Sequence, residues 1–280
     1  MLRSPLLLHI PHAATCIPLS EYGDFVVDRA TLDAQRATLD AELLRLTDRY
    51  TDALYGDGFP PPQIVAADVS RLVVDVERFS DDSFEPCAAQ GMGAVYVRTS
   101  TGAPLRRISD QRRAELLDKY DWPHHRRLDA MALLALEQFG RCVIIDAHSF
   151  PVQPLPTQVA LTDLPEIGIG TDMTHTSAAL RALTEAFFVD RGFHVGVECL
   201  LRSGCAGTVG DDRGASRSLH GRAHGRTAAG VSRRAACTHR VSWAARGVVA
   251  GSRAIRVGLS RSRLRDRALD GHVRGLQRKR

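Results

Sequence analysis

The sequence lacks the long apolar runs and paired cysteines that would indicate a membrane protein or a disulfide-bonded secreted protein. No apolar stretch approaches the roughly 18 residues needed to cross a membrane. The stretch Leu6–Ile10 is bounded by Pro5 and Pro11 and is too short for a signal peptide. The six cysteines form no Cys-x-x-Cys pair, which favours reduced thiols over a disulfide framework or a structural zinc cage. We therefore expect a cytoplasmic protein that makes no membrane contact.

The last part of the chain, residues 199–280, lacks proline, phenylalanine, tyrosine and glutamate altogether. This segment carries 18 Arg and 1 Lys against 4 Asp, a net charge of +15, whereas residues 1–198 carry a net charge of −10. Such a composition buries too little apolar surface to offset the entropy of ordering, so we expect a disordered basic tail. A tail of this kind binds nucleic acid only non-specifically, because it lacks the interleaved aromatic residues that stack on bases.

Strand-like and helix-like segments alternate through the first 198 residues. Apolar and β-branched runs predict strands at Leu6–Ile10, Gln63–Ala67, Leu72–Val76, Cys142–Asp146, Gln158–Leu161, Ile167–Ile169 and Phe193–Val197. Helical spacing and capping residues predict helices over Thr31–Tyr55, from the N-cap Ser109 to Tyr120, from Pro123 to Gly140, and over Thr176–Asp190. The alternation predicts an α/β fold with a mostly parallel or mixed sheet flanked by helices, in which ligands bind at the carboxyl ends of strands.

Two histidines follow predicted strands and therefore lie where such a fold binds its ligands. His12 follows the first strand, and His148 follows the Cys142–Asp146 strand. An acidic and arginine-rich stretch, residues 68–78, lies between them in the sequence. Two histidines and a carboxylate are a common ligand set for a hydrolytic metal ion, which polarises a carbonyl and lowers the pKa of water. The pattern is typical of a metal-dependent hydrolase, and the residues alone leave open the alternative that both histidines are hydrogen-bonded structural residues.

Four ordered motifs resemble those of the N-formylglutamate amidohydrolases, also called N-formylglutamate deformylases. They are His9-Ile10-Pro11-His12, Leu46-Thr47-Asp48, Ser70-Arg71-Leu72-Val73-Val74-Asp75 and Asp146-Ala147-His148-Ser149-Phe150-Pro151. The resemblance runs nearly continuously over residues 5–197. It implies a zinc-exopeptidase-like α/β fold, a divalent metal such as zinc or cobalt, and hydrolysis of N-formyl-L-glutamate to formate and L-glutamate. That reaction closes one route of histidine degradation.

The resemblance also implies roles for individual residues. His12, Asp48 and His148 match the metal ligands, with Asp75 or Glu77 as alternatives to Asp48 for the carboxylate. Arg78, Arg71 and Asp75 match the part of the site that binds the substrate, because a dianionic substrate needs guanidinium partners for its carboxylates.

The general base of the family is a glutamate on a late strand, in a segment like Met-x-Glu-Val. No such segment follows Val197. However, His220-Gly221-Arg222-Ala223 can be encoded so that a one-nucleotide shift reads Met-Val-Glu, and the same shift gives Cys199–Gly210 a family-like sequence. This favours a frameshift near Glu198. We therefore divide the chain into a truncated metallo-amidohydrolase domain, residues 1–198, and an out-of-frame tail, residues 199–280.

Three other functions fit parts of the sequence. A related hydrolase acting on another N-acyl amino acid or on a peptidoglycan amide would share the metal ligands and differ in substrate. An inactive remnant would keep the fold without the base. A nucleic-acid-binding protein would depend on the basic tail and show salt-dependent binding.

Overall fold

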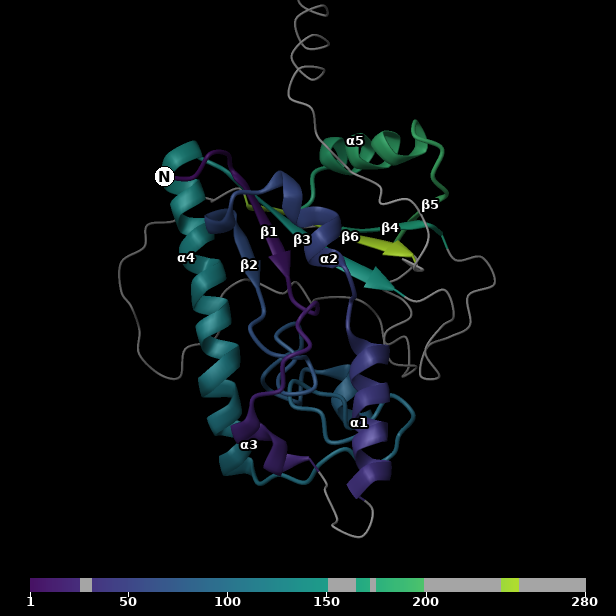
Figure 1. Ribbon diagram of the computed structural model, residues 1–280. Coiled ribbons are helices and arrows are strands. Elements are labelled where there is room, and N and C mark those ends of the chain that lie inside the picture. The colour runs from purple at the N-terminus through teal and green to yellow at the C-terminus, as the bar shows by residue number, and fades with distance from the viewer. Residues whose placement is uncertain (26–31, 151–164, 172–174, 199–237, 247–280) are drawn as a thin grey trace, which may run out of the picture.

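The computed structural model describes residues 1–25, 32–150, 165–171, 175–198 and 238–246. It contains a six-stranded sheet in the order β2-β1-β3-β6-β4-β5 (Figure 1). The strands are β1 (Leu6–Ile10), β2 (Ile64–Ala66), β3 (Cys142–Phe150), β4 (Ile167–Thr171), β5 (Val195–Val197) and β6 (Thr238–Arg246). All neighbouring strands are parallel except β4 and β6, which are antiparallel. The predicted α/β class with a mixed sheet is confirmed.

The helices follow the predicted pattern closely where the sequence supplies caps. They are α1 (Leu32–Leu46), α2 (Thr51–Tyr55), α3 (Asp110–Leu116), α4 (Trp122–Phe139) and α5 (Ala178–Val189). Short 3-10 turns lie at Leu19–Asp24, Gly56–Gly58, Pro61–Gln63 and Pro86–Gln90, and a π turn, Leu117–Asp121, joins α3 to α4. Ser109 caps α3 by accepting a hydrogen bond from the Arg112 amide, and Gly140 ends α4 in the left-handed conformation, with φ 66°.

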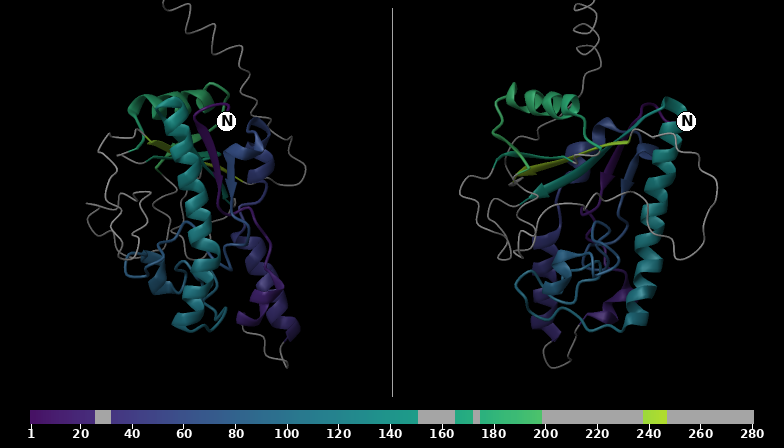
Figure 2. Two further views of the ribbon diagram at one scale, coloured as in Figure 1. Left: turned by 90° about the vertical axis from the view of Figure 1, so that its left-hand side faces the viewer. Right: turned by 180° about the vertical axis from the view of Figure 1, so that it is seen from behind.

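The sheet is covered on both faces around β1 and β3. Leu7 of β1 and Ile144 of β3 pack with Leu128 and Ala132 of α4. The alternate side chains of the same strands face the other side of the sheet and pack with Tyr55 of α2. Figure 2 shows α4 lying along one side of the sheet and continuing past its edge. The longest helix therefore connects the sheet to the part of the molecule beneath it.

A second core lies beyond the carboxyl ends of β1 and β3. It is built mainly from α1, α3 and the coil between β2 and α3, and its buried members include Phe25, Leu39, Leu72, Val74, Tyr96, Leu105 and Leu116. The prediction of a strand at Leu72–Val76 is wrong, because this run forms turns, with a hydrogen bond from the Val73 amide to the Ser70 carbonyl. Turns bury consecutive side chains in this core, so an uninterrupted apolar run here does not need a strand.

The predicted helix Thr31–Tyr55 is two helices in the structure. The α1 helix ends at Leu46, and Tyr50 takes the left-handed conformation with φ 65° before α2 begins. The Thr47 hydroxyl bonds to the Leu43 carbonyl, and the Asp48 amide donates to the His12 carbonyl instead of continuing the helix. The interruption holds Asp48 against the chain that follows β1.

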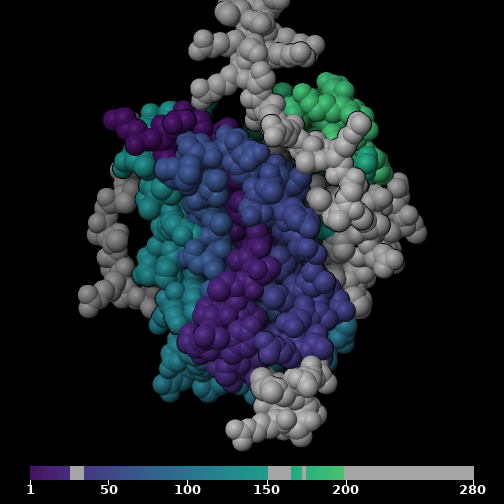
Figure 3. Space-filling model, viewed as in Figure 1, coloured from purple at the N-terminus to yellow at the C-terminus, as the bar shows by residue number. Residues whose placement is uncertain are grey.

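The segment after β1 is fixed on both sides by backbone hydrogen bonds. The Asp48 amide bonds to the His12 carbonyl, the Ala67 amide to the Ile10 carbonyl, and the Ser70 amide to the Cys16 carbonyl. Figure 3 shows this N-terminal segment, in purple, running between blue segments of the first half of the chain. The position of His12 is therefore set by two neighbouring stretches and not by β1 alone.

The tail contributes one element that the sequence did not predict. Residues 238–246 form β6, which lies between β3 and β4 and pairs with β3 over nine positions, from Cys142↔Thr238 to Phe150↔Arg246. The prediction of a disordered tail over residues 199–280 did not include this strand. The reason is that β3 and β4 each offer an open backbone edge there, which a neighbouring strand satisfies. The predicted strand Gln158–Leu161 and the rest of the tail lie outside the described residues.

Two other sequence expectations concern membranes and thiols. None of the described helices is long and apolar enough to span a membrane. Among the described cysteines, Cys16 is exposed and free, and Cys142 is buried and free.

Glu21 joins the 3-10 turn after β1 to the α3–α4 segment, and its contacts predict a pH dependence of stability. Burial raises the pKa of Glu21, but hydrogen bonds from Lys119, Tyr120 and Ser20, together with the charge of Arg112, lower it from 4.5 to about 2. Because the folded-state pKa is lowered, the stabilisation is present above pH 4.5 and disappears as the pH falls toward 2. Glu21→Gln should reduce the free energy of unfolding at pH 7 by about 1–3 kcal/mol.

Urea unfolding at pH 7 and at pH 3 tests this prediction. The difference in stability between the parent and Glu21→Gln should be smaller at pH 3, and a difference that stays constant or grows would contradict it. Comparing the two proteins at each pH removes the contribution of the other carboxylates, which is the same in both.

Candidate metal centre

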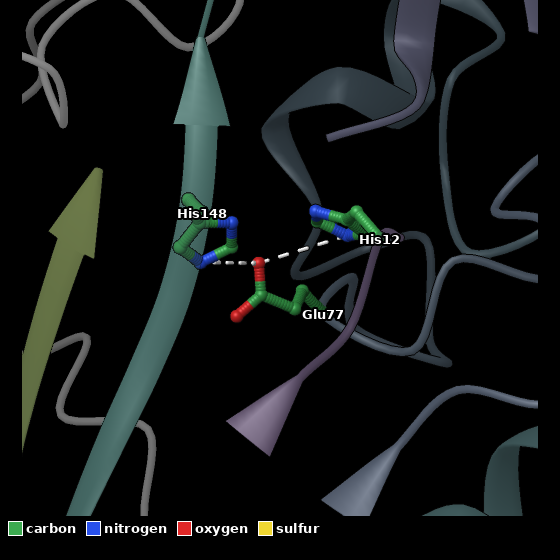
Figure 4. Close-up of side chains that lie close together, drawn as sticks. All are labelled: His12, Glu77 and His148. Atoms are coloured by element: carbon green, nitrogen blue, oxygen red, sulfur yellow. Dashed lines mark ion pairs between the residues drawn. The ribbon is translucent and has the colours of Figure 1, made fainter. Parts of the chain in front are cut away.

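His12 and His148 come together at one edge of the sheet, as expected of residues at the carboxyl ends of adjacent parallel strands. His12 follows β1, and His148 lies near the end of β3. Their ring centroids are 5.3 Å apart, and the planes are tilted by 48°. Figure 4 shows the two imidazoles facing the same space, with the Glu77 carboxylate between them. The two strands therefore bring together residues separated by 136 positions.

Asp48 lies beside the Nδ1 atoms of both histidines. Its Oδ2 is 2.9 Å from Nδ1 of His148 and 3.7 Å from Nδ1 of His12. Burial raises the pKa of Asp48, but the interactions with His12 and His148 outweigh this and lower the pKa far below its ordinary value. The interruption between α1 and α2 thus supplies an ionised carboxylate to both rings.

Glu77 lies on the other side of the rings, beside their Nε2 atoms. Its Oε2 is 3.3 Å from Nε2 of His148 and 3.7 Å from Nε2 of His12 (Figure 4). Burial lowers the pKa of His148, but neighbouring carboxylates, above all Glu77 and Asp146, raise it well above 6.5. The cluster therefore favours positive charge at this position, either a proton on the imidazole or a bound cation.

Asp75 is the central acceptor of the network and is completely buried. Its Oδ1 accepts from Nε2 of His12 at 2.9 Å and from the Glu77 amide at 3.0 Å. Its Oδ2 accepts from Nη2 of Arg71 at 2.7 Å and from the Tyr96 hydroxyl at 2.5 Å. Burial raises the pKa of Asp75, but the charges of Arg71 and His12 lower it well below its ordinary value. Asp75 is therefore an ionised carboxylate with both oxygens occupied.

The three residues that the resemblance assigns to substrate binding lie in this network but differ in access. The side chain of Asp75 has no exposed surface, so the structure does not place it where a substrate would touch it. Arg71 and Arg78 keep 14% and 21% of their side-chain surface exposed. Arg78 contacts Glu85 at 3.1 Å and approaches Asp75 at 3.6 Å. Both guanidinium groups are thus anchored by buried carboxylates near the histidines.

Sequence reasoning assigned no role to three residues that adjoin this cluster. His9 and Asp146 are register partners in β1 and β3, and Nδ1 of His9 lies 2.7 Å from Oδ1 of Asp146. Nε2 of His9 lies 2.8 Å from Nε2 of His124, at the beginning of α4. Asp146 precedes His148 by two residues, and alternate residues of a strand share a face. The sequence could therefore have indicated that Asp146 adjoins the site. No local pattern marked His124.

The donor atoms present fit a divalent metal ion. His12, Glu77 and His148 each offer a ligand atom within 4.8 Å of the others. Asp48 offers a carboxylate on the Nδ1 side of the same rings. Nδ1 of His12 is buried and has no hydrogen-bond partner in the structure, which is unusual for a buried nitrogen. A cation ligated through that lone pair would satisfy it.

Comparison with known proteins agrees with the fold and the motifs. Residues 4–205 match the sequence model of the N-formylglutamate amidohydrolase family. The chain is similar in structure to N-formylglutamate amidohydrolase from Ralstonia eutropha JMP134, with 19% identity, a TM-score of 0.62, and coverage of 88% of this chain and 82% of that chain. It is also similar to gene product Atu2144 from Agrobacterium tumefaciens, with 17% identity, a TM-score of 0.53, and coverage of 88% and 81%. No curated protein sequence matches the chain.

The position of Asp75 predicts a large effect of a small substitution. Asp75→Asn keeps the shape of the side chain but removes the charge that balances Arg71 and Arg78. We expect a loss of about 3–5 kcal/mol in the free energy of unfolding, the range for removing one partner from a buried ion pair. Asp68→Asn is the matched control, because the Asp68 side chain is 80% exposed and pairs with Arg127 only at the surface. That control should change the free energy by less than about 1 kcal/mol. Urea unfolding of both variants would reject this account if the two losses were equal.

Proposed function

The chain belongs to the N-formylglutamate amidohydrolase family, and on this basis we propose that it is built to hydrolyse N-formyl-L-glutamate to formate and L-glutamate with a divalent metal ion. The observation that carries the metal part of the proposal is the convergence of His12, Asp48 and His148, together with the unpartnered Nδ1 of His12. The reaction would close a route of histidine degradation.

We assign the metal ligands to the Nδ1 side of the two rings. Asp75 is ionised and can only accept, so Nε2 of His12 carries the proton and Nδ1 keeps a lone pair. Metal-binding histidines commonly donate their second N–H to a carboxylate in this way. In His148 the Nε2 atom faces Glu77 and Asp146, and Nδ1 lies 2.9 Å from Asp48, so a cation bound there would take the place of the proton between Nδ1 and Asp48. Asp48 is therefore the preferred third ligand, and Glu77 the alternative through the Nε2 atoms.

A divalent cation at this position, zinc or cobalt, would polarise the formyl carbonyl and lower the pKa of the attacking water. The protein itself orients the ligands and the substrate. Asp75 fixes the ring of His12, and the exposed parts of Arg71 and Arg78 offer positive charge to a substrate with two carboxylates. Besides anchoring buried carboxylates, both guanidinium groups keep exposed surface near the histidines, and this favours a dianionic substrate over a neutral acyl amide.

The ligand assignment predicts different metal affinities for two variants. Asp48→Asn should weaken zinc or cobalt binding by more than about 100-fold, because it removes a charged ligand. Glu77→Gln should weaken binding by roughly 10–100-fold or less, as expected for a residue that only supports the ligands. Isothermal titration of the metal-free proteins measures both.

If Glu77→Gln weakens metal binding more than Asp48→Asn does, the third ligand is Glu77 and not Asp48. If neither variant differs from the parent, and His12→Ala and His148→Ala also bind normally, the metal centre is not at this position. His194→Ala serves as a control for histidines that bind metal at the surface, since His194 is exposed and belongs to neither candidate metal-binding group among the described residues.

We further propose that the chain lacks the general base, because residues 199–280 contain no glutamate. A positioned general base is worth about 10²–10⁴-fold in rate, so formate release from N-formylglutamate should be slower by this factor than in a protein translated in the shifted frame after codon 198. The coding DNA around that codon tests the frameshift directly, and an assay of both proteins with added zinc or cobalt tests its consequence.

Equal turnover by the two proteins would show that the tail supplies what the reaction needs.

A substrate series in the faster protein separates the rival specificities. Replacing the glutamate side chain of the substrate with a neutral one should lower kcat/KM if Arg71 and Arg78 bind carboxylates. In that protein, Arg78→Ala should lower kcat/KM for N-formylglutamate by an amount equivalent to about 2–5 kcal/mol. A preference for neutral acyl substrates would favour a related amidohydrolase instead.

A further inference from the structure

A buried chain of three side chains extends from the metal centre to helix α4. Asp146 contacts Nδ1 of His9 at 2.7 Å, and Nε2 of His9 contacts Nε2 of His124 at 2.8 Å. All three residues are at most 5% exposed. Asp146 also lies 3.6 Å from Nε2 of His148, so the chain ends at a proposed ligand. This arrangement is not needed for the packing of the strands, which is supplied by the apolar residues around it.

The contacts determine where the protons lie. An ionised Asp146 only accepts, so Nδ1 of His9 carries a proton and donates it to the carboxylate. The ring proton of His124 finds a partner only through Nε2, so Nε2 of His124 donates and Nε2 of His9 accepts. This leaves Nδ1 of His124 as a bare lone pair, in agreement with its being buried and without a hydrogen-bond partner. Burial is the largest cause that lowers the pKa of His124 to about 2, so its ring is neutral.

The two proposed histidine ligands are supported in similar ways. Nε2 of His12 bonds to the buried Asp75 at 2.9 Å, and Nε2 of His148 lies 3.6 Å from the buried Asp146, with Glu77 at 3.3 Å on the same side. Arg71 and Tyr96 hold Asp75 in place. Among the described residues, His9 makes the shortest contact with Asp146. A carboxylate that orients a ligand must itself be fixed, and for Asp146 this is done by an imidazole on the neighbouring strand.

We propose that His9 is a positioning residue that fixes the His148 ring through Asp146. His124 in turn holds His9 in the tautomer that donates to Asp146. The orientation of one metal ligand thereby depends on the register of β1 against β3 and on the docking of α4 to the sheet. The proposal rests on the proposed function, because its purpose is to present Nδ1 of His148 to a cation.

Matched substitutions in the full chain separate the two contacts of His9. In His9→Asn the amide nitrogen takes the place of Nδ1 and keeps the bond to Asp146, whereas His9→Leu removes both contacts. In His124→Gln the amide nitrogen takes the place of Nε2, whereas His124→Leu removes the donor. Gln63→Leu is the control for loss of a buried polar group, because Gln63 is 1% exposed and bonds to the Leu6 carbonyl at 2.6 Å, at the other end of β1.

Cobalt titration, followed by visible absorption, gives the first readout. His9→Leu should bind cobalt roughly 10–100-fold more weakly and with an altered spectrum, while His9→Asn should recover most of the affinity. His124→Leu should show a smaller loss that His124→Gln restores. Gln63→Leu should lower the melting temperature without changing cobalt binding. Unchanged affinity in His9→Leu, or equal losses in His9→Leu and Gln63→Leu, would overturn the proposal.

Nuclear magnetic resonance of the histidine rings gives a second readout that needs no metal. Long-range ¹H–¹⁵N spectra of the metal-free chain should show the proton of His9 on Nδ1 and that of His124 on Nε2. The ring signals of His148 should shift in His9→Leu and not in Gln63→Leu. If they do not shift, the positioning role is refuted whatever the cobalt result. If they shift but the parent binds no cobalt, the positioning role stands and the proposed metal-dependent function fails.

Discussion

The buried carboxylate of Asp75 is the interaction on which the rest of the site depends. Burying an ionised carboxylate is very unfavourable unless its oxygens are filled by donors. Here His12, Arg71 and Tyr96 supply those donors, and each comes from a different stretch of the chain. The segment around Asp75 therefore has to form turns that face the second core, and those turns place Arg71, Glu77 and Arg78 around the histidines.

The sheet and the second core contribute different parts of the same centre. Parallel pairing of β1 with β3 brings His12 close to His148, whereas the coil beneath the sheet supplies the carboxylates and guanidinium groups. Helix α4 packs on the sheet and reaches beyond it, so it ties the two parts together (Figure 2). A change in the docking of α4 would therefore alter the surroundings of the histidine cluster as well as the core.

The sequence correctly predicted the elements whose ends are marked by particular residues, such as helix caps. The strand Leu6–Ile10 agrees with the structure, and the helices capped by Ser109 and closed by Gly140 agree closely. Prediction failed where tertiary contacts decide the backbone, as at Leu72–Val76 and in the interruption before α2. His12, Asp48 and His148 were identified from motifs and do lie together. His124 was not, because its contact with His9 spans 115 positions and leaves no local pattern.

Strand β6 illustrates that backbone pairing and catalysis make different demands on the sequence. Strand β3 carries His148 and has an open edge on the side away from β1, so a partner strand there keeps the backbone of the site paired. Residues 238–246 supply that pairing over the whole length of β3. Backbone pairing makes little demand on side-chain identity, so a segment of the basic tail can provide it. A general base demands a specific side chain, and residues 199–280 contain no glutamate. The sheet can therefore be paired along β3 even where, as we propose, the tail supplies no general base.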